Sequence, residues 1–393
     1  MIASKTIVSA LTLSALAAAA PAPSNFSIRQ VAVKGHDVHP AALYARALAR
    51  FDLEVPEHIA RAASTCEKGS VITNPYKNDA TYLTPVKVGN NNLLMNFDTG
   101  SASLWVMTKS TPDIGSHKTY DPRTGRLMKD YFWSAKNGKG VTLQGGVYRD
   151  KVTIAGITYG DQAVQTVKIV IPASAGLSKR PYDGIVGFAL SQRNPVRPNL
   201  QQTFFENIKD KLVDPVLGIY LKHGAPGAFD FGWVDDKKFK GDLVWMGVDS
   251  SQGLWKIIVD GYAIGNEFSS PYSFNAIIDT GTSILLLEEK IVKEYYKMIS
   301  SAYYDSANGG WVFRCDDIIP NLIFNIGPYS AEIPGDYMKY LSNGTYCYGG
   351  AQSLPGGRRD TSVLGDIFIK TQYLVLDHSD PKNPRVGIAS QAY

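Results

Sequence analysis

One short stretch occurs twice in the chain, and each copy places an Asp where a strand is expected to end. The copies are Phe97-Asp98-Thr99-Gly100-Ser101 and Ile278-Asp279-Thr280-Gly281-Thr282-Ser283. Apolar residues precede each Asp and a Gly follows it, a pattern that predicts a buried strand breaking into a turn. A single Asp-Thr-Gly triplet would say little, so the repetition is what constrains the fold.

Each copy is followed, at a nearly equal distance along the chain, by a second apolar-apolar-Gly signal. These signals are Ile185-Val186-Gly187 after the first Asp and Val363-Leu364-Gly365 after the second. Two related β-rich halves are therefore predicted, each contributing one Asp to a site where the halves meet. The other interpretation is two coincidental turns at strand ends.

These motifs resemble the pepsin-like aspartic proteases, and most closely the secreted fungal penicillopepsin and aspergillopepsin type. The resemblance covers about Gly69 to Tyr393. Besides the two Asp-Thr-Gly turns, it rests on Leu104-Trp105-Val106, Leu364-Gly365-Asp366, Tyr373-Leu374-Val375-Leu376-Asp377, and Cys315 with Cys347. It implies a mainly β, bilobal pepsin-like fold, with two related β-rich lobes and the active-site cleft between them.

The resemblance also implies the roles of the repeated residues. Asp98 and Asp279 would be catalytic, because two carboxyls about 3 Å apart cannot comfortably ionise together and share one proton, which suits acid pH. The supporting residues would be the threonines that bond to the opposite lobe, the hydroxyls that bond to the carboxylates, and the turn glycines: Thr99, Thr280, Ser101, Thr282, Gly100 and Gly281. No cofactor or metal is expected.

The N-terminal region differs in amino-acid composition from the rest of the chain. Residues 1–20 carry Lys5, an apolar run and Ala17 to Ala20 before Pro21, which is typical of a secretory signal peptide. A membrane anchor is the alternative, but the run is short for a bilayer span. The protein is therefore expected to be secreted and extracellular.

Residues 21–68 read as a propeptide that inhibits its own enzyme. In zymogens of the family a basic residue pairs with the catalytic carboxylates, and Arg50-Phe51 is the candidate plug, with Lys34 or Arg46 as alternatives. Protonating the carboxylates would release a cationic plug. A processed solubility spacer is the other interpretation, and the cut is expected near Lys68-Gly69.

The remaining chain is assigned to two lobes, 69–235 and 236–393. Short strands are predicted at 82–88, 93–97 and 147–154, and helices at 200–208 and 288–299. Of 393 residues, 44% are apolar and 19% charged, which excludes a disordered chain. The net charge of +4 has no basic block, so neither nucleic acid nor a membrane is an expected partner.

The chain has three cysteines, an odd number for a secreted protein. By the resemblance Cys315 pairs with Cys347, leaving Cys66 in the propeptide, where it is lost on maturation or cross-links the proenzyme. Of two glycosylation sequons, Asn25 falls in the propeptide and Asn343, followed by Gly344, in the mature part.

The sequence departs from the family at the flap that covers the cleft. The family's flap pattern is aligned here on four residues, Trp133, Gly138, Gly140 and Gly145. In this alignment Asn137 stands where a Tyr is usual and Lys139 where an acidic residue is usual. The lost Tyr would have bonded to the Trp that Trp105 matches, so looser closure is expected. Tyr131 or Phe132 substitutes for it if this register is wrong.

The function predicted is a secreted aspartic endopeptidase that prefers large apolar or aromatic residues around the cut, because Lys139 repels a substrate Lys. Its expected partners are protein and peptide substrates, its own propeptide and pepstatin-type inhibitors, and it is expected to be a monomer. The alternative is a pepsin-fold protein of low or no turnover that binds peptides or acts as an inhibitor decoy. Zinc, thiol and serine protease motifs are missing from the sequence.

Overall fold

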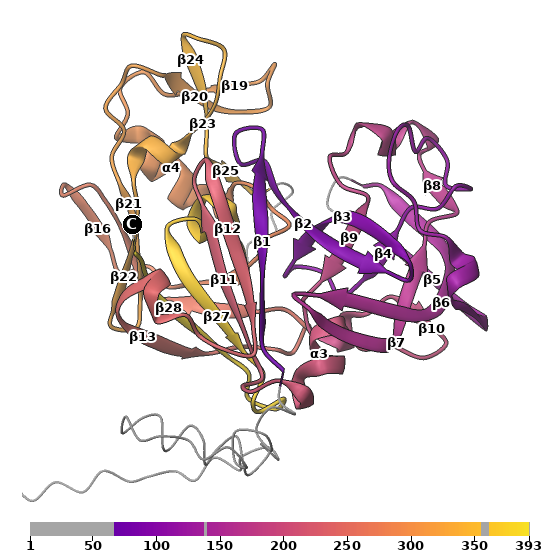
Figure 1. The fold of residues 1–393 in the computed structure, drawn as a ribbon. Helices are drawn as coiled ribbons and strands as arrows, with labels where there is room; N and C mark the ends of the chain where they lie inside the picture. Colours follow the sequence, from indigo (N-terminus) through magenta and orange to yellow (C-terminus); the bar gives the residue numbers. More distant parts are fainter. Residues whose placement is uncertain (1–66, 137–139, 355–360, 393) are drawn as a thin grey trace, which may run out of the picture. The chain divides into compact units, whose positions relative to one another are not determined.

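The computed structural model describes residues 67–136, 140–354 and 361–392, all within the unit Gly35–Tyr393 (Figure 1). These ranges form mainly β-strands with few helices, so the predicted β-rich, pepsin-like fold class is confirmed. None of the helices in the described ranges is both long and apolar enough to span a membrane.

One large sheet runs through both halves of the chain. Its 15 strands are, in spatial order, β10 (Val196–Arg197), β5 (Arg126–Lys136), β6 (Thr142–Ile154), β7 (Ile157–Thr166), β4 (Leu104–Val106), β9 (Gly184–Gly187), β3 (Asn91–Asp98), β2 (Thr81–Val88), β1 (Gly69–Tyr76), β12 (Ala225–Phe231), β11 (Val216–Lys222), β27 (Gln372–Asp377), β28 (Arg385–Gln391) and β13 (Phe239–Gly247), with β8 (Ile169–Ile171) beside β6. β11 pairs with β27, from Val216 opposite Asp377 to Ile219 opposite Leu374. Strands from the beginning, middle and end of the described chain therefore share one sheet.

The C-terminal half adds three smaller sheets. They are β14 (Lys256–Val259), β17 (Phe274–Ile278), β26 (Ser362–Leu364), β18 (Leu285–Leu287) and β25 (Ala351–Ser353); β16 (Phe268–Ser270), β15 (Gly261–Ile264), β21 (Leu322–Ile326) and β22 (Tyr329–Ile333); and β19 (Tyr303–Asp305), β20 (Gly310–Arg314), β24 (Tyr346–Gly349) and β23 (Lys339–Ser342). The first of these sheets carries the second Asp.

Within residues 67–136, 140–354 and 361–392, helices are short and few. The α-helices are α3 (Phe204–Ile208), α4 (Glu289–Lys297) and α5 (Asp366–Ile369), and the 3₁₀ turns are Pro122–Thr124, Ala173–Ala175, Leu177–Lys179, Ser191–Arg193, Lys209–Lys211, Asp236–Lys238 and Gly335–Met338. The strands predicted at 82–88, 93–97 and 147–154 are confirmed as parts of β2, β3 and β6. The helix predicted from residue 200 begins only after Thr203, whose side chain caps it by accepting the Glu206 amide.

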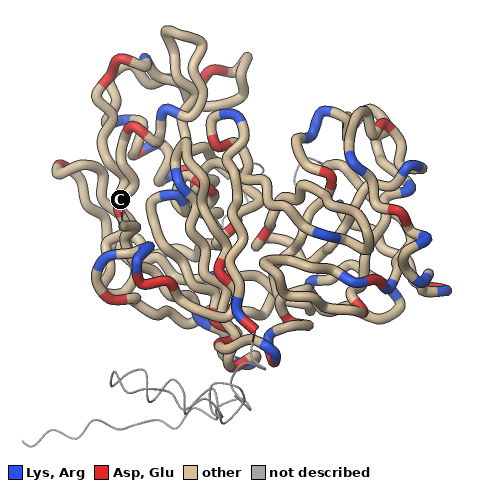
Figure 2. The backbone as a smooth tube through the Cα atoms, in the orientation of Figure 1, with Lys and Arg blue, Asp and Glu red and all other residues tan. Residues whose placement is uncertain are grey.

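The strand that delivers the first Asp is fixed by aromatic packing. Phe97 is 1% exposed, and its ring lies 4.9 Å from that of Phe188 and 4.8 Å from that of Phe229. Tilted aromatic contacts of this kind stabilise a core beyond the area that they bury. The carboxylate of Asp98 is therefore positioned by a rigid strand. Acidic and basic residues are interspersed along the backbone (Figure 2).

The first described residues are hydrogen-bonded to the body of the protein. Glu67 donates its amide to the Lys211 carbonyl at 2.6 Å and accepts the Val213 amide at 3.0 Å. The ammonium of Lys68 lies 5.7 Å from the centroid of the Trp233 ring, a cation–π distance. Glu67 and Lys68 therefore belong to the folded body and precede β1 without a break.

We therefore expect the processed protein to begin at or before Glu67, slightly upstream of the predicted cut, because losing Glu67 and Lys68 would remove two backbone hydrogen bonds and a cation–π contact. N-terminal sequencing of the stable acid-processed product measures this directly. A product that starts at Gly69 or later would contradict the expectation.

Candidate active site

Each repeated Asp lies at or just after the end of a strand. That strand pairs in parallel with the strand carrying the apolar-apolar-Gly signal that follows the Asp in the sequence. In β3 and β9, Asp98 lies opposite Gly187. In β17 and β26, Ile278, the residue before Asp279, lies opposite Leu364. The internal repeat of the sequence is therefore a repeat of local structure.

The glycine of each apolar-apolar-Gly signal, Gly187 or Gly365, is required because another part of the backbone approaches it closely. A Cβ on Gly187 would lie 2.3 Å from the Ser101 carbonyl oxygen, and a Cβ on Gly365 would lie 2.2 Å from that of Thr282. No side chain fits at these distances without moving the turn that carries the Asp. The two apolar-apolar-Gly signals thus hold the two Asp turns in place.

The two carboxylates are held in the same way. Each accepts one hydrogen bond from a backbone amide of its own turn and one from a hydroxyl of the same turn. For Asp98 the donors are the Gly100 amide (2.8 Å) and Ser101 Oγ (2.6 Å), and for Asp279 they are the Gly281 amide (2.8 Å) and Thr282 Oγ1 (2.7 Å). Both carboxylates are half-buried and fixed in orientation.

The turn glycines bring the two carboxylates face to face. A Cβ on Gly100 would lie 2.6 Å from Asp279 Oδ1, and a Cβ on Gly281 would lie 2.5 Å from Asp98 Oδ1. Each glycine therefore contacts the carboxylate of the other half. Any larger residue there would push the two Asp side chains apart.

Two threonines lock the turns to one another. Thr99 Oγ1 donates to the Ile278 carbonyl at 2.8 Å and accepts the Thr280 amide at 3.0 Å. Thr280 Oγ1 in turn donates to the Phe97 carbonyl at 2.6 Å and accepts the Thr99 amide at 3.1 Å. Thr99 is fully buried and Thr280 is 3% exposed, so water does not compete for these four bonds.

Burial, and after it the negative charge of Asp279, raise the pKa of Asp98 to about 7, while the hydrogen bonds from Ser101 and Gly100 act in the opposite direction. The pair therefore keeps one proton up to near-neutral pH. With one member protonated and the other ionised, the site can donate a proton and accept one at the same moment. In the ranges that the structure describes, no group of three His, Cys, Asp or Glu side chains is placed to hold a metal ion.

The predicted flap region is a β-hairpin. β5 and β6 pair with Trp133 opposite Gly145 and Lys136 opposite Thr142. The tip residues Asn137, Gly138 and Lys139 lie outside the described residues, so their assignment to the flap stays a prediction. Trp105, in β4, is 4% exposed, and its ring lies 6.2 Å from that of Tyr182 in an edge-to-face arrangement.

Tyr182 is a site residue that the sequence did not reveal. Its ring lies against that of Trp105, and burial raises its pKa, with the charge of Asp98 adding to the rise and that of Arg180 opposing it. Its hydroxyl accepts a hydrogen bond from Arg180 Nη1 at 2.9 Å. Tyr182 lies just before the Ile185-Val186-Gly187 signal, but the sequence analysis gave it no role.

Asp366 is a third carboxyl close to the pair. It is 1% exposed, and its Oδ1 has no hydrogen-bond partner in the described part of the chain. Burial raises its pKa well above the usual value, and the charge of Asp279 adds to this while Lys370 opposes it. Its backbone amide donates to the Thr282 carbonyl at 2.8 Å. Asp366 belongs to the Leu364-Gly365-Asp366 motif, but no function was predicted for it from the sequence.

A buried ion pair joins the start of the N-terminal half to the end of the chain. Lys370 Nζ donates to Asp79 Oδ2 at 2.9 Å, and both side chains are almost fully buried. Burial alone would raise the pKa of Asp79, but Lys370 with His223 and the Gly224 amide holds it below its usual value. This pair connects the turn before β2 to the residue after α5, close to Asp366.

The structure contains the disulfide between Cys315 and Cys347 that the resemblance implied. Asn343 is exposed in the turn between β23 and β24. Cys66, Asn25 and the candidate plug Arg50-Phe51, with its alternatives Lys34 and Arg46, lie outside the described residues.

Replacing Gly281 by Ala should lower hydrolysis of a peptide substrate about a hundredfold or more, because the new methyl would displace the Asp98 carboxylate by about 1 Å. Gly160→Ala is the matched control, since a Cβ there meets nothing within 4 Å. Steady-state kinetics of both variants measures the effect. Equal activity of the two variants would show that the face-to-face geometry is wrong.

The raised pKa of Asp98 sets the direction of the pH dependence. Hydrolysis needs the shared proton, so kcat/KM should fall as pH rises through about 7. Ser101→Ala removes a hydrogen bond that favours the ionised carboxylate, so this decline should move to higher pH. Ser101→Thr, which retains a hydroxyl, should leave the decline in place. A shift to lower pH in Ser101→Ala would contradict this account.

Comparisons with known proteins place this geometry in a family. The profile of the eukaryotic aspartyl protease family matches residues 81–391. Penicillopepsin-1 of Talaromyces stipitatus is 46% identical over 395 residues, covering 100% of both chains. Aspergillopepsin-1 of Aspergillus pseudoglaucus and aspergillopepsin-1 of Aspergillus oryzae are each 42% identical, covering 98% of this chain and 99% of theirs. This chain therefore belongs to the eukaryotic aspartyl protease family and is an aspartic endopeptidase.

Proposed function

We propose that this endopeptidase is secreted as an inactive proenzyme and hydrolyses peptide bonds at acid pH with water activated between Asp98 and Asp279. The observation that carries the proposal is the reciprocal contact of each turn glycine with the opposite carboxylate, which sets the two carboxyls face to face. The relatives named penicillopepsin and aspergillopepsin, matched over nearly their full length, support the same class of reaction.

The reaction requires both states of the pair. The ionised carboxylate takes a proton from the water held between the two side chains, while the protonated carboxyl donates a hydrogen bond to the substrate carbonyl and polarises it. The water oxygen attacks the carbonyl carbon, and the proton passes to the departing nitrogen as the C–N bond breaks. No covalent intermediate with the enzyme forms, and the pair returns to its singly protonated state.

The surrounding residues act by positioning. Ser101 and Thr282 each hold one carboxylate oxygen, which leaves the inner oxygens to face the water. Thr99 and Thr280 keep the turns in contact, so both carboxyls reach the same water molecule. Gly100 and Gly281 leave room for that approach. Together these contacts order the site before substrate binds, so that little conformational entropy is lost during the reaction.

Substrate preference is proposed from the flap register. Asn137 offers less apolar area than a tyrosine, and Lys139 places a positive charge where a substrate Lys would be repelled. The buried side chains of Trp105 and Trp133 give the base of the hairpin an apolar lining. We therefore assign a preference for large apolar or aromatic residues on both sides of the cut.

The proenzyme is proposed from the N-terminal sequence. Residues 1–20 act as the signal peptide and the following segment, to about residue 68, occupies the active site until acid protonates the carboxylates. Arg50 is the candidate cation and Phe51 its apolar neighbour. The two lobes, 69–235 and 236–393, act as a monomer, because one chain holds both halves of the site, and Glu67 and Lys68 are expected to stay attached to the first lobe.

The experiment is to express the full chain with its prosegment, lower the pH to about 4, and follow both its mass and its hydrolysis of an acid-unfolded protein. Self-processing and hydrolysis that pepstatin inhibits are expected in the natural chain, and neither is expected in Asp279→Asn. The products are then sequenced to read the residues on each side of the cut.

Three outcomes would count against the proposal. A processed, folded protein that binds pepstatin but cleaves nothing would favour a peptide-binding or decoy role. Equal hydrolysis by Asp279→Asn would remove the paired carboxyls from the reaction. Product ends rich in Lys on the N-terminal side of the cut would contradict the assigned place of Lys139 in the flap.

A further inference from the structure

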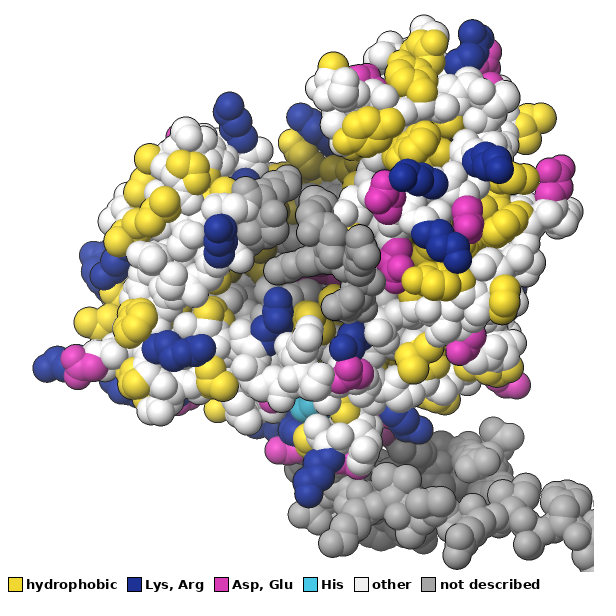
Figure 3. All heavy atoms as spheres, turned by 180° about the vertical axis from the view of Figure 1, so that it is seen from behind, with side chains coloured by type: hydrophobic (Ala, Val, Ile, Leu, Met, Phe, Trp, Pro, Cys, Tyr) yellow, Lys and Arg dark blue, Asp and Glu magenta, His cyan; other side chains and the backbone are white. Residues whose placement is uncertain are grey.

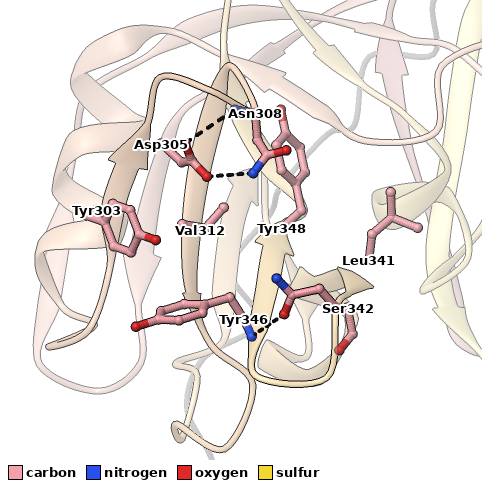
Figure 4. Close-up of a pocket in the computed structure, with 9 residues that line it drawn as sticks. Tyr303, Asp305, Asn308, Val312, Leu341, Ser342, Tyr346 and Tyr348 are labelled. Atoms are coloured by element: carbon pink, nitrogen blue, oxygen red, sulfur yellow. Dashed lines mark hydrogen bonds between the residues drawn. The ribbon is translucent and has the colours of Figure 1, made fainter.

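A pocket unrelated to the paired carboxylates lies on the small sheet formed by β19, β20, β24 and β23 (Figure 4). Its volume is about 410 Å³. It is lined by side chains from all four strands and their turns: Tyr303, Asp305, Asn308, Val312, Leu341, Ser342, Asn343, Tyr346 and Tyr348. Hydrophobic side chains gather on this end of the C-terminal half (Figure 3).

The walls of the pocket combine aromatic faces with polar edges. Figure 4 shows the rings of Tyr303, Tyr346 and Tyr348 around Val312, with Leu341 on the far side. The rings of Tyr303 and Tyr346 meet edge to face at 5.8 Å. Tyr303 is 46% exposed and Leu341 43% exposed, so apolar surface faces solvent here. A sugar ring has a matching surface, with C–H groups on its faces and hydroxyls around its rim.

The charges at the pocket disfavour ionic ligands. No Lys or Arg is among its lining residues, so an anion would find no partner there. Asp305 is committed to its own turn, because it accepts the amides of Ala307 and Asn308 and also Asn308 Nδ2. The Asn308 hydrogen bonds lower the pKa of Asp305 and occupy its carboxylate oxygens. A neutral ligand with hydroxyl groups therefore fits best.

Asn343, one of the lining residues, begins the sequon Asn343-Gly344-Thr345. Its Oδ1 accepts the amides of Thr345 at 3.1 Å and Tyr346 at 2.8 Å. This arrangement leaves Nδ2, the atom that carries an N-linked sugar, without a partner in the described chain. Gly344 has φ +100°, which suits an exposed turn that an oligosaccharide-transferring enzyme can reach.

We infer that the pocket holds the first sugars of an N-linked glycan attached to Asn343, with the Tyr303 and Tyr346 rings packed against them. The inference rests on the proposed passage through the secretory pathway. The link to Asn343 keeps the glycan beside the pocket at a high effective concentration, so weak packing on the rings is enough to hold it. The glycan would then cover apolar surface that otherwise faces water.

The frame around the pocket is rigid enough to receive a ligand without rearrangement. The disulfide joins Cys347, between Tyr346 and Tyr348 in β24, to Cys315 just after β20. Ser342 Oγ accepts the Gly344 amide at 2.9 Å and so fixes the start of the turn. A preorganised site of this kind loses little conformational entropy when it is filled.

The test uses the full-length protein secreted from a eukaryotic host that adds high-mannose glycans. Peptide mass mapping first measures occupancy of Asn343 in the natural chain, in Thr345→Ser, which keeps the sequon, and in Thr345→Ala, which removes it. Occupancy is expected in the first two and absent in the third. An unmodified Asn343 in a secreted, active protease would overturn the inference and leave the proposed function standing.

The second measurement asks whether the attached sugars lie in the pocket. Endoglycosidase H must reach the bond between the first two sugars, so its rate on the folded protein reports how well that bond is covered. Tyr303→Ala should speed release about fivefold, the change expected from losing one ring contact. Tyr304→Ala is the matched control, because Tyr304 is 56% exposed, packs on Trp311 and does not line the pocket.

Equal release from Tyr303→Ala, Tyr304→Ala and the natural chain would show a glycan that projects into solvent and would overturn the inference. Retained hydrolysis of a peptide substrate shows that Tyr303→Ala is folded, since Tyr303 has no part in the catalytic site. If Tyr303→Ala does not fold, Tyr346→Phe and Leu341→Ala replace it: the ring-retaining variant should release slowly and Leu341→Ala faster. The Thr345→Ala protein lacks the glycan at Asn343. If added soluble oligosaccharide protects this variant from proteolysis as strongly as the attached glycan protects the natural chain, the pocket binds free polysaccharide instead.

Discussion

Four hydrogen bonds between Thr99 and Thr280 and the backbone of the opposite turn hold the two Asp turns together. Two carboxylates repel each other, so nothing in their own charges would bring Asp98 and Asp279 into contact. The threonines supply the opposing attraction, and because they are buried they do so without competition from water. The close approach of the two carboxyls and the need for glycine at positions 100 and 281 follow from this contact, and the charge of Asp279 then adds to burial in raising the pKa of Asp98.

Much of this arrangement could be predicted from the sequence, because it depends on local motifs that occur twice. The two Asp-Thr-Gly turns, the apolar-apolar-Gly signals that end at Gly187 and Gly365, and the strands that lead to them are short-range features with a strong period and strong turn signals. The start of α3 was misplaced because the apolar pattern from Leu200 continues the helical spacing, whereas the Thr203 cap begins the helix later.

The parts that escaped prediction depend on contacts between distant residues. Asp79 and Lys370 are 291 residues apart, and nothing near either one marks it as a partner of the other. Asp366 was visible in a motif, but its burial beside Asp279 appears only when the second turn is folded against α5. Tyr182 precedes the Ile185-Val186-Gly187 signal, but its contact with Trp105 appears only in the fold. The pocket on the small sheet likewise exists only because β19 and the β23–β24 hairpin meet.

The order of strands in the large sheet carries a consequence for synthesis of the chain. β11, in the N-terminal half, pairs with β27 at residues 372–377, and β28 follows at residues 385–391. During translation the first half therefore emerges with an open strand edge, which is prone to wrong pairing. This edge cannot close until residues 372–377 have been synthesised. The large sheet is thus completed only when strands from both halves of the chain are present.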